Sequence, residues 1–567
     1  MPSPDVAEIV ARFVRAYDVD TVFGLLGEAN LALMLALERE GVTWVAMRRE
    51  DGVVAAADGY AQATERLAVA VVSQGPALAN ALNPLIGAAK GGTPLVLLTG
   101  GIAPDRRNEP QWIDQRELVE GTGHVRYRRV DDAASAADTI AEAFSLAQTE
   151  RAPVVLEIPT ETQVQPVTAD TRALFAAASV HARDRMTSAG GPRADPDASA
   201  AAIAALAAAE RPLLLAGRGA RGARAELLAL ARRVGALVGT TLPMKGYFDG
   251  DPTSLGVIGG FSTERARDLA AASDVIVVFG ASLNQFTTSS GRLLRGKTLI
   301  RVDTRQQKPD LRGAGAARIL ELTGDSAVTA RALTDGLRGD RTAWHARPAA
   351  PDVIDDQSDP SGLDLRVVSQ WLDRVLPADR ALALDLGYFT SEPSVHIGVR
   401  APDRHAFTLH FGSIGLGLAT AIGVSSAHRD LPTVCAIGDG GLMSSLQELE
   451  TVARSGLPVV VAVYDDDAYG VEVYELQHRG EDEQLAVFPR VAFAPIAQAM
   501  GLSALTIEDD TGLEAAQRHL ESHPGRPVLL DFRLRRGVMT RWYLDSVHAD
   551  FLARTGTHHH DDTERPQ

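Results

Sequence analysis

Carboxylates follow hydrophobic runs at two places in the last third of the chain. The segment 432–470 reads PTVCAIGDGGLMSSLQELETVARSGLPVVVAVYDDDAYG, with Asp439 after the first run and Asp465–Asp467 after the second. Carboxylate oxygens suit a hard divalent cation, and the glycines beside Asp439 let backbone amides approach an anion closely. Together these residues predict a metal ion that bridges the protein to a diphosphate.

Two hydrophobic runs, 432–437 and 458–464, must position these acids. Each run is typical of a buried strand, and a helical segment lies between them. Both acidic sites then fall at the carboxyl ends of parallel strands, where open α/β sheets bind ligands. Taken alone, the first motif also fits a strand–turn–helix with an acidic cap, and the second also fits a solvated turn.

Three further segments carry glycines or acids at comparable turns. Residues 47–64 (MRREDGVVAAADGYAQAT) place Glu50 at a helix start, where an acid is also favourable for the helix dipole. Residues 411–423 (FGSIGLGLATAIG) form a glycine-rich start of another helix, which close packing alone could require. Residues 73–76 (SQGP) end a predicted strand and precede Asn80.

These four segments together resemble the thiamine-diphosphate enzymes of the decarboxylase and carboligase branch, which includes acetolactate synthase, pyruvate decarboxylase and benzoylformate decarboxylase. The matches span most of the first and last thirds of the chain. The resemblance implies thiamine diphosphate and Mg²⁺ as cofactors. It assigns the metal ligands as Asp439, Asp466 and the backbone carbonyl of Ala468, with Asp466 in place of the more usual asparagine.

The resemblance also implies roles for residues around the cofactor. Glu50 matches the glutamate whose proton, shared with N1′ of the aminopyrimidine, favours the imino tautomer; N4′ of that tautomer then removes the C2 proton. Gly412 would supply a carbonyl to N4′, and Ile414 would be the apolar wedge that bends the cofactor. The other predicted cofactor-binding residues are Gly75, Asn80, Gly438, Gly440, Gly441 and Tyr469.

Two predicted catalytic residues bear on the fate of the substrate. Gln111 falls where acetolactate synthases hold the glutamine of a Phe-Gln-Glu motif, and segment 104–118 lacks the His-His pair of pyruvate decarboxylases. Glu472 falls where pyruvate-decarboxylase-like enzymes hold a proton-handling glutamate, although a solvated helix glutamate fits equally. Further candidates for proton transfer are His405, His410 and His478. Histidines in such places are more often surface or capping residues.

From this resemblance we expect an enzyme that decarboxylates a small 2-oxo acid and joins the fragment to a second carbonyl compound, as acetolactate synthases do. The alternative is a simple 2-oxo acid decarboxylase that releases an aldehyde. A nucleotide-dependent oxidoreductase would leave the motif spacing unexplained, and a relative without catalysis would leave the retained acids unexplained. A homodimer or homotetramer is implied, with Glu50 and Asp439 of each site on different chains.

Short apolar runs alternate with longer helical periods along the whole chain, as expected for parallel sheets covered by helices on both faces. Residues 183–198 and 337–362, rich in proline, glycine and charge, are typical of linkers. The predicted fold class is α/β, with three doubly wound parallel-sheet domains. The domains are a pyrimidine-binding domain at 1–182, a middle domain at 198–337 and a diphosphate- and Mg-binding domain at 362–550, followed by a flexible tail at 551–567.

The middle domain contains a second glycine-rich motif, GRGARG at 217–222, directly after a predicted strand. Such a loop could cradle the diphosphate of FAD or the ADP part of a CoA ester. No acidic residue follows at the spacing that would hold a ribose, and a lone loop of this type is a weak signal. The sequence therefore disfavours bound FAD.

Composition restricts the remaining classes of function. The chain has 567 residues, of which 45% are hydrophobic and 23% charged, as in ordinary globular proteins. A net charge of -17 disfavours a nucleic-acid partner. The single cysteine, Cys435, excludes an internal disulfide framework, and no apolar run approaches the ~18 residues of a membrane span. Since no signal-peptide pattern opens the chain, we expect a cytoplasmic protein.

Overall fold

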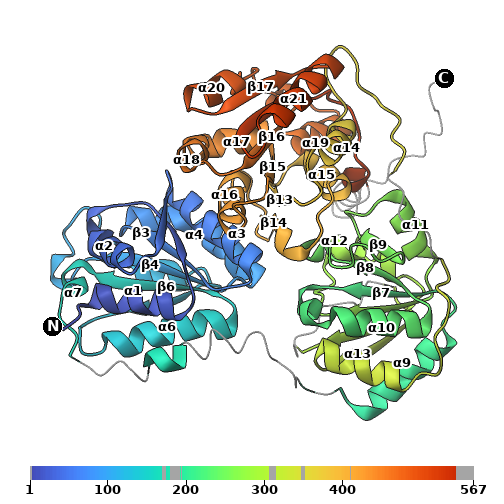
Figure 1. The fold of residues 1–567 in the computed structure, drawn as a ribbon, viewed down its shortest axis with the longest axis horizontal. Coiled ribbons are helices and arrows are strands. Elements are labelled where there is room, and N and C mark those ends of the chain that lie inside the picture. Colours follow the sequence, from blue (N-terminus) through green and yellow to red (C-terminus); the bar gives the residue numbers. More distant parts are fainter. Residues whose placement is uncertain are drawn as a thin grey trace.

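Three sheets, each of six parallel strands, form the framework of the protein (Figure 1). The computed structural model describes residues 3–168, 174–178, 192, 194–304, 315–345, 352–408 and 410–544. Helices cover the sheets, so the predicted α/β class with three doubly wound parallel-sheet domains is confirmed. The predicted tail at 551–567 lies outside the described residues, as does most of the predicted linker at 183–198.

The first sheet has the strand order β2-β1-β3-β4-β6-β5. Its strands are β1 (Thr21–Gly24), β2 (Thr43–Ala46), β3 (Ala68–Val72), β4 (Leu95–Gly101), β5 (Arg126–Arg129) and β6 (Pro153–Pro159). The α-helices around it are α1 (Val6–Ala16), α2 (Leu31–Arg39), α3 (Glu50–Thr64), α4 (Pro76–Gly91), α5 (Gln115–Glu120), α6 (Ala136–Glu150) and α7 (Thr160–Gln163). The chain changes direction across the sheet between β1 and β3, which places a crevice at their carboxyl ends.

The third sheet, coloured orange to red in Figure 1, repeats this topology as β14-β13-β15-β16-β18-β17. Its strands are β13 (Ala381–Leu384), β14 (His405–Phe407), β15 (Thr433–Gly438), β16 (Val459–Asp465), β17 (Ser503–Ile507) and β18 (Val528–Arg533). The α-helices are α14 (Leu365–Val375), α15 (Ser391–His396), α16 (Gly417–Ala427), α17 (Asp439–Ser445), α18 (Glu448–Ser455), α19 (Gly470–Arg479), α20 (Phe493–Ala499) and α21 (Asp510–Ser522). The sequence itself shows no corresponding repeat.

The middle sheet has the order β12-β11-β10-β7-β8-β9, the order of dinucleotide-binding folds. Its strands are β7 (Pro212–Ala216), β8 (Leu237–Thr240), β9 (Ser254–Val257), β10 (Val275–Phe279), β11 (Thr298–Asp303) and β12 (Arg318–Thr323). The α-helices are α9 (Pro196–Ala208), α10 (Arg224–Val234), α11 (Glu264–Ala272), α12 (Gln285–Thr288) and α13 (Ser326–Asp335). The GRGARG motif forms a 3₁₀ helix, η4 (Arg218–Ala223), directly after β7.

Six strands were not predicted from the sequence: β5, β8, β9, β12, β14 and β17. Five of them lie at sheet edges, where only one neighbour covers the strand. Two of these edge strands, β12 and β17, contain several exposed or partly exposed residues, so they lack the continuous buried apolar run by which the central strands were recognised. The strands before Asp439 and Asp466, β15 and β16, are central and were indicated by the hydrophobic pattern, whereas Glu50 and the Gly412–Ile414 turn follow the edge strands β2 and β14.

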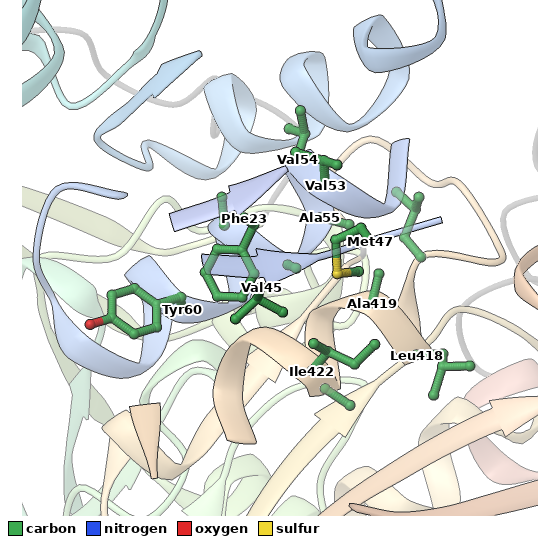
Figure 2. Close-up of a cluster of buried hydrophobic side chains, with 14 of the residues drawn as sticks. Phe23, Val45, Met47, Val53, Val54, Ala55, Tyr60, Leu418, Ala419 and Ile422 are labelled. Carbon is green, nitrogen blue, oxygen red and sulfur yellow. The ribbon is translucent and has the colours of Figure 1, made fainter. Parts of the chain in front are cut away.

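Helix α3 of the first domain packs directly on α16 of the last domain, and one hydrophobic cluster joins the two (Figure 2). Glycines let the two helix backbones approach closely. A Cβ atom added at Gly423 would lie 1.9 Å from the carbonyl oxygen of Ala56, and one at Gly59 would lie 2.4 Å from that of Thr420. Because α3 begins at Glu50 and α16 follows the predicted Gly412–Ile414 turn, this contact fixes two parts of the predicted site relative to each other.

We expect Gly423→Ala to destabilise the protein by about 1–3 kcal/mol, because the added methyl group must push two packed helix backbones apart. The midpoint of urea unfolding measures this effect. The matched control is Gly222→Ala, where an added Cβ meets no atom within 4 Å. Equal midpoints for Gly423→Ala and the wild type would show that α3 and α16 are not held in this close contact.

Candidate active site

A cavity of about 710 Å³ opens at the carboxyl edge of the third sheet. Asp439 begins α17 directly after β15, and Asp466 follows β16, the neighbouring strand. Both carboxylates line the cavity. The other predicted site residues that line it are Gly412, Ile414, Gly438, Gly440, Gly441, Ala468, Tyr469 and Glu472. Ten residues from separate segments of the sequence therefore meet in one space.

The three consecutive aspartates after β16 have different partners. Asp465 is buried and forms an ion pair with Arg533 on the neighbouring strand β18. Asp467 forms an ion pair with Arg490, with an N–O distance of 3.1 Å. Asp466 has no ion pair with any cation in the described part of the chain, and its side chain faces the cavity. Of the three, Asp466 is thus the one that can act as a metal ligand.

Burial and neighbouring aspartates raise the pKa values of the two cavity carboxylates. Burial, together with the nearby charge of Asp466, raises the pKa of Asp439 to about 8. Burial and the charge of Asp465 raise the pKa of Asp466 to about 7. Two buried carboxyl groups with raised pKa values favour a bound cation at neutral pH, because a positive charge would offset both the desolvation and the repulsion.

The backbone around Asp439 leaves room for an anion but not for side chains. A Cβ atom at Gly440 would lie 2.5 Å from the Tyr469 ring, and one at Gly441 would lie 2.3 Å from a carboxylate oxygen of Asp385. No group of three or more His, Cys, Asp or Glu side chains in the described residues could hold a metal ion without other ligands. Two carboxylates, a carbonyl and accessible amides therefore fit a Mg²⁺ ion whose remaining ligands come from a diphosphate.

The Gly412–Ile414 turn is held by a buried carboxylate. Asp385 follows β13, and its two oxygens accept hydrogen bonds from the amides of Gly415 (2.9 Å) and Gly417 (3.3 Å). Burial raises the pKa of Asp385 to about 6, while these amides act in the opposite direction. Gly412 has a φ of 85°, a conformation that favours glycine, and the Ile414 side chain stays 38% exposed. The turn thus presents an apolar side chain at the cavity rim.

A second group of predicted residues lies at the carboxyl edge of the first sheet. Asn80 donates a hydrogen bond to the Glu50 carboxylate (3.0 Å). Gly75, with a φ of 56°, lies against the backbone of Gln111, since a Cβ atom there would be 2.1 Å from the Gln111 carbonyl oxygen. None of these four residues lines the large cavity. The structure therefore brings the predicted residues together in two groups, one on each of two domains.

One residue at this edge, Gln115, was not predicted from the sequence. Gln115, 6% exposed, accepts a hydrogen bond from the Gly75 amide (2.9 Å) and donates one to buried Glu157 (2.6 Å). Its role depends on burial, which no local pattern indicated.

The three candidate histidines have different environments. Burial lowers the pKa of His405 to about 3 and that of His410 to about 4, so both stay uncharged at neutral pH. Only His410 lines the cavity. The Nδ1 atom of His478 lies 2.7 Å from the carbonyl oxygen of Tyr474, one turn earlier in α19. These environments disfavour His405 and His410 as proton donors.

The GRGARG loop of the middle domain contacts other protein segments. A Cβ atom at Gly217 would lie 2.5 Å from the carbonyl oxygen of Gly280, so this glycine is needed for packing against the end of β10. Arg218 donates a hydrogen bond to the Gly91 carbonyl, and Arg221 forms an ion pair with Glu65 (2.9 Å). Both arginines therefore bridge the middle domain to the first domain.

Comparison with known proteins gives matches along most of the chain. Three profiles of the thiamine pyrophosphate enzyme family match: the N-terminal TPP binding domain at residues 4–118, the central domain at 199–333 and the C-terminal TPP binding domain at 385–532. A probable acetolactate synthase large subunit of Methanococcus aeolicus is 24% identical, over 93% of this chain and 92% of the relative. A probable 2-ketoarginine decarboxylase of Pseudomonas aeruginosa is 28% identical, over 93% of each chain.

The fold has a close counterpart among solved structures. A thiamine diphosphate-dependent 4-hydroxybenzoylformate decarboxylase of Rhodococcus jostii superimposes with a TM-score of 0.76 at 19% identity. The match covers 94% of this chain and 100% of that one. Among the described residues, no helix combines the length and apolar character needed to cross a membrane.

The raised pKa values of Asp439 and Asp466 predict how stability depends on pH in the absence of metal. The folded protein holds protons on these groups at pH values where the unfolded chain, with carboxyl pKa values near 4, has released them. Their contribution to the free energy of unfolding is therefore complete below about pH 4 and is lost as the pH rises through 7 to 8. In Asp439→Asn one of the two acids cannot ionise, so we expect the free energy of unfolding to fall less over this pH range than in the wild type.

Unfolding midpoints between pH 5.5 and 8.5, in EDTA and in Mg²⁺, measure both effects. Because Mg²⁺ competes with the bound protons, its stabilising effect on the wild type should increase over this range. The same pH slope in EDTA for the wild type and Asp439→Asn would contradict the proposed crowding of the two carboxylates.

Proposed function

The chain belongs to the thiamine pyrophosphate enzyme family, and from this premise we propose that it decarboxylates a small 2-oxo acid and joins the fragment to a second carbonyl compound. The observation that carries the proposal is the Asp439–Asp466 pair in the 710 Å³ cavity, where crowded carboxylates favour a cation. The named relatives include both an acetolactate synthase and a decarboxylase, which supports this reaction class.

We propose that Asp439, Asp466 and the Ala468 carbonyl bind Mg²⁺, with the amides around Gly440 beside the diphosphate. Bound thiamine diphosphate would supply an electron sink for the loss of CO₂ from the substrate. The Gly412–Ile414 turn, held by Asp385, would orient the cofactor rings. Domain boundaries at 1–182, 198–337 and 362–550 would then separate pyrimidine-binding, middle and diphosphate-binding units.

Glu50 would hold a proton at N1′ of the aminopyrimidine ring. Its carboxylate already accepts a hydrogen bond from Asn80, which fixes its direction at the start of α3. Gly75 and Gln111 would form the neighbouring wall. Since this group does not line the large cavity of its own chain, a complete site would need both groups at one place.

A homodimer would bring the two groups together, with Glu50 of one chain facing Asp439 of the other. Exposed apolar side chains on the first and last domains support this arrangement, because they would be covered in such an interface. On the last domain they are Phe411, Ile414, Met443, Tyr469, Leu485 and Phe488. On the first domain they are Leu26, Leu31 and Leu35, which follow β1. A tetramer would be a pair of such dimers.

The alternative is a decarboxylase that releases an aldehyde, and Glu472 is the observation that favours it. Glu472 lies in the first turn of α19 and lines the cavity, six residues after Asp466. There it could donate a proton to the decarboxylated fragment. Gln111, which has no proton to donate in this way, would instead favour carboligation by orienting an acceptor carbonyl through a hydrogen bond.

We expect Glu50→Gln to bind thiamine diphosphate and Mg²⁺ with nearly unchanged affinity but to lose about 10²–10⁴ in rate, because proton transfer at N1′ is impaired. Calorimetry measures the affinity, and hydrogen–deuterium exchange at C2 of the bound cofactor measures the proton transfer. Asp439→Ala is the contrasting variant, which should lose the affinity itself. Exchange at the wild-type rate in Glu50→Gln would remove Glu50 from the proposal.

We expect Glu472→Gln to slow aldehyde release and to increase the ligated share of product, because the fragment loses a proton donor. The experiment supplies a panel of 2-oxo acids, with and without an aldehyde or a second 2-oxo acid, and separates the products by chromatography. An unchanged rate and product ratio would leave Glu472 without a role. If the wild type forms only aldehyde from every donor, the decarboxylase alternative replaces the carboligase.

A further inference from the structure

A buried carboxylate of the last domain holds the chain segment that leads into Glu50. Glu448 opens α18, nine residues after Asp439, and is 1% exposed. One of its oxygens accepts hydrogen bonds from the backbone amides of Arg48 (3.0 Å) and Arg49 (3.2 Å). Its other oxygen accepts one from the Thr451 hydroxyl (2.7 Å). No ion pair neutralises Glu448 among the described residues, so these donors stabilise the buried acid.

The two amides are those of the residues immediately before Glu50. Arg49 is the N-cap residue of α3, and its own side chain makes no capping hydrogen bond. Helix starts leave backbone amides without partners inside the helix, and short polar side chains next to the start usually accept from them. Here the acceptor comes from a residue about 400 positions away, in another domain. The path of the chain into α3 thus depends on Glu448.

The surroundings of Glu448 are adapted to this contact. A Cβ atom at Gly52 would lie 2.8 Å from the accepting oxygen, so the glycine leaves space for the carboxylate. On the outer side, Glu450 forms ion pairs with Arg48 (2.6 Å) and Arg454 (3.0 Å). Arg454 also donates a hydrogen bond to the carbonyl of Ala46 at the end of β2 (2.6 Å). Helix α18 therefore holds the connection from β2 to α3 at both ends.

We propose that Glu448 is a positioning residue for Glu50, fixing the direction from which the Glu50 carboxyl group reaches N1′ of the cofactor. The inference rests on the proposed role of Glu50. Glu448 itself would touch neither cofactor nor substrate. Its carboxylate would act through the backbone of residues 48 and 49, whose displacement would move the first turn of α3.

The test compares Glu448→Ala and Glu448→Gln with the wild type in the holoenzyme. Misplacement of a catalytic group by about 1 Å can cost about 10²-fold in rate, so Glu448→Ala should slow C2 hydrogen–deuterium exchange by a factor of this order. Its affinity for thiamine diphosphate and Mg²⁺ should change little, because Asp439 and Asp466 are intact. Glu448→Gln keeps one acceptor oxygen for the two amides, so its rate of C2 exchange should fall less than that of Glu448→Ala.

Asp325→Ala is the matched control for lost stability. Asp325 caps α13 in the middle domain and accepts hydrogen bonds from two backbone amides, those of Ala327 and Val328 (both 2.9 Å). Its removal should lower the thermal midpoint, since lost caps typically cost about 1 kcal/mol, and should leave C2 exchange unchanged. A Glu448 variant that behaved like this control, with a lower midpoint and wild-type exchange, would overturn the proposal.

Two results separate this inference from the proposed function. If Glu50→Gln slows exchange and neither Glu448 variant does, Glu50 keeps its role and the positioning role of Glu448 is wrong. If the wild type binds no thiamine diphosphate, the proposed function itself fails. Should Glu448→Ala not fold, Glu448→Gln decides: exchange slowed at retained cofactor affinity supports the proposal, and wild-type exchange overturns it.

Discussion

Repulsion between Asp439 and Asp466 is the constraint on which the candidate site depends. The two acids stand at the ends of adjacent parallel strands, where burial raises both pKa values. The charge of Asp466 raises the pKa of Asp439 further, and the charge of Asp465 raises that of Asp466. Proteins rarely retain such a pair without a compensating charge. Arg533 and Arg490 are already paired with the flanking aspartates Asp465 and Asp467. Arg536 acts on Asp466 by lowering its pKa, yet the pKa stays raised, and a divalent cation bound to a diphosphate would supply further positive charge.

Buried carboxylates that bind backbone amides recur around this site. Asp385 holds the turn before α16, and Glu448 holds the turn before α3. Each accepts hydrogen bonds from backbone amides of an irregular segment, which satisfies the buried carboxylate and restrains the segment. Helices α3 and α16 then pack through Gly59 and Gly423, so the two turns belong to one rigid unit although they come from different domains.

The identical strand orders of the first and last sheets explain why the site has two halves. In both domains, the segments with the predicted site residues follow strands near the point where the chain reverses its direction across the sheet. One domain offers Glu50 and Asn80 at this edge, and the other offers Asp439 and Asp466. Neither edge by itself has all the groups that the proposed chemistry needs, which is why the proposal combines the two edges across two chains.

The sequence by itself determined the α/β class and the central strands, because long apolar runs alternate with helical periods. It also indicated that Asp439 and Asp466 follow the carboxyl ends of two parallel strands; both do, and the structure places these strands side by side. Edge strands such as β12 and β17 were not predicted from the sequence, because a strand with one open side does not need a continuous apolar run. The resemblance singled out Asp466 among three consecutive aspartates; only the tertiary structure gives the physical reason, since partners distant in sequence pair with the other two. Only the tertiary structure likewise reveals Glu448 and Gln115, because both are buried against segments distant in sequence, which the local sequence pattern does not indicate.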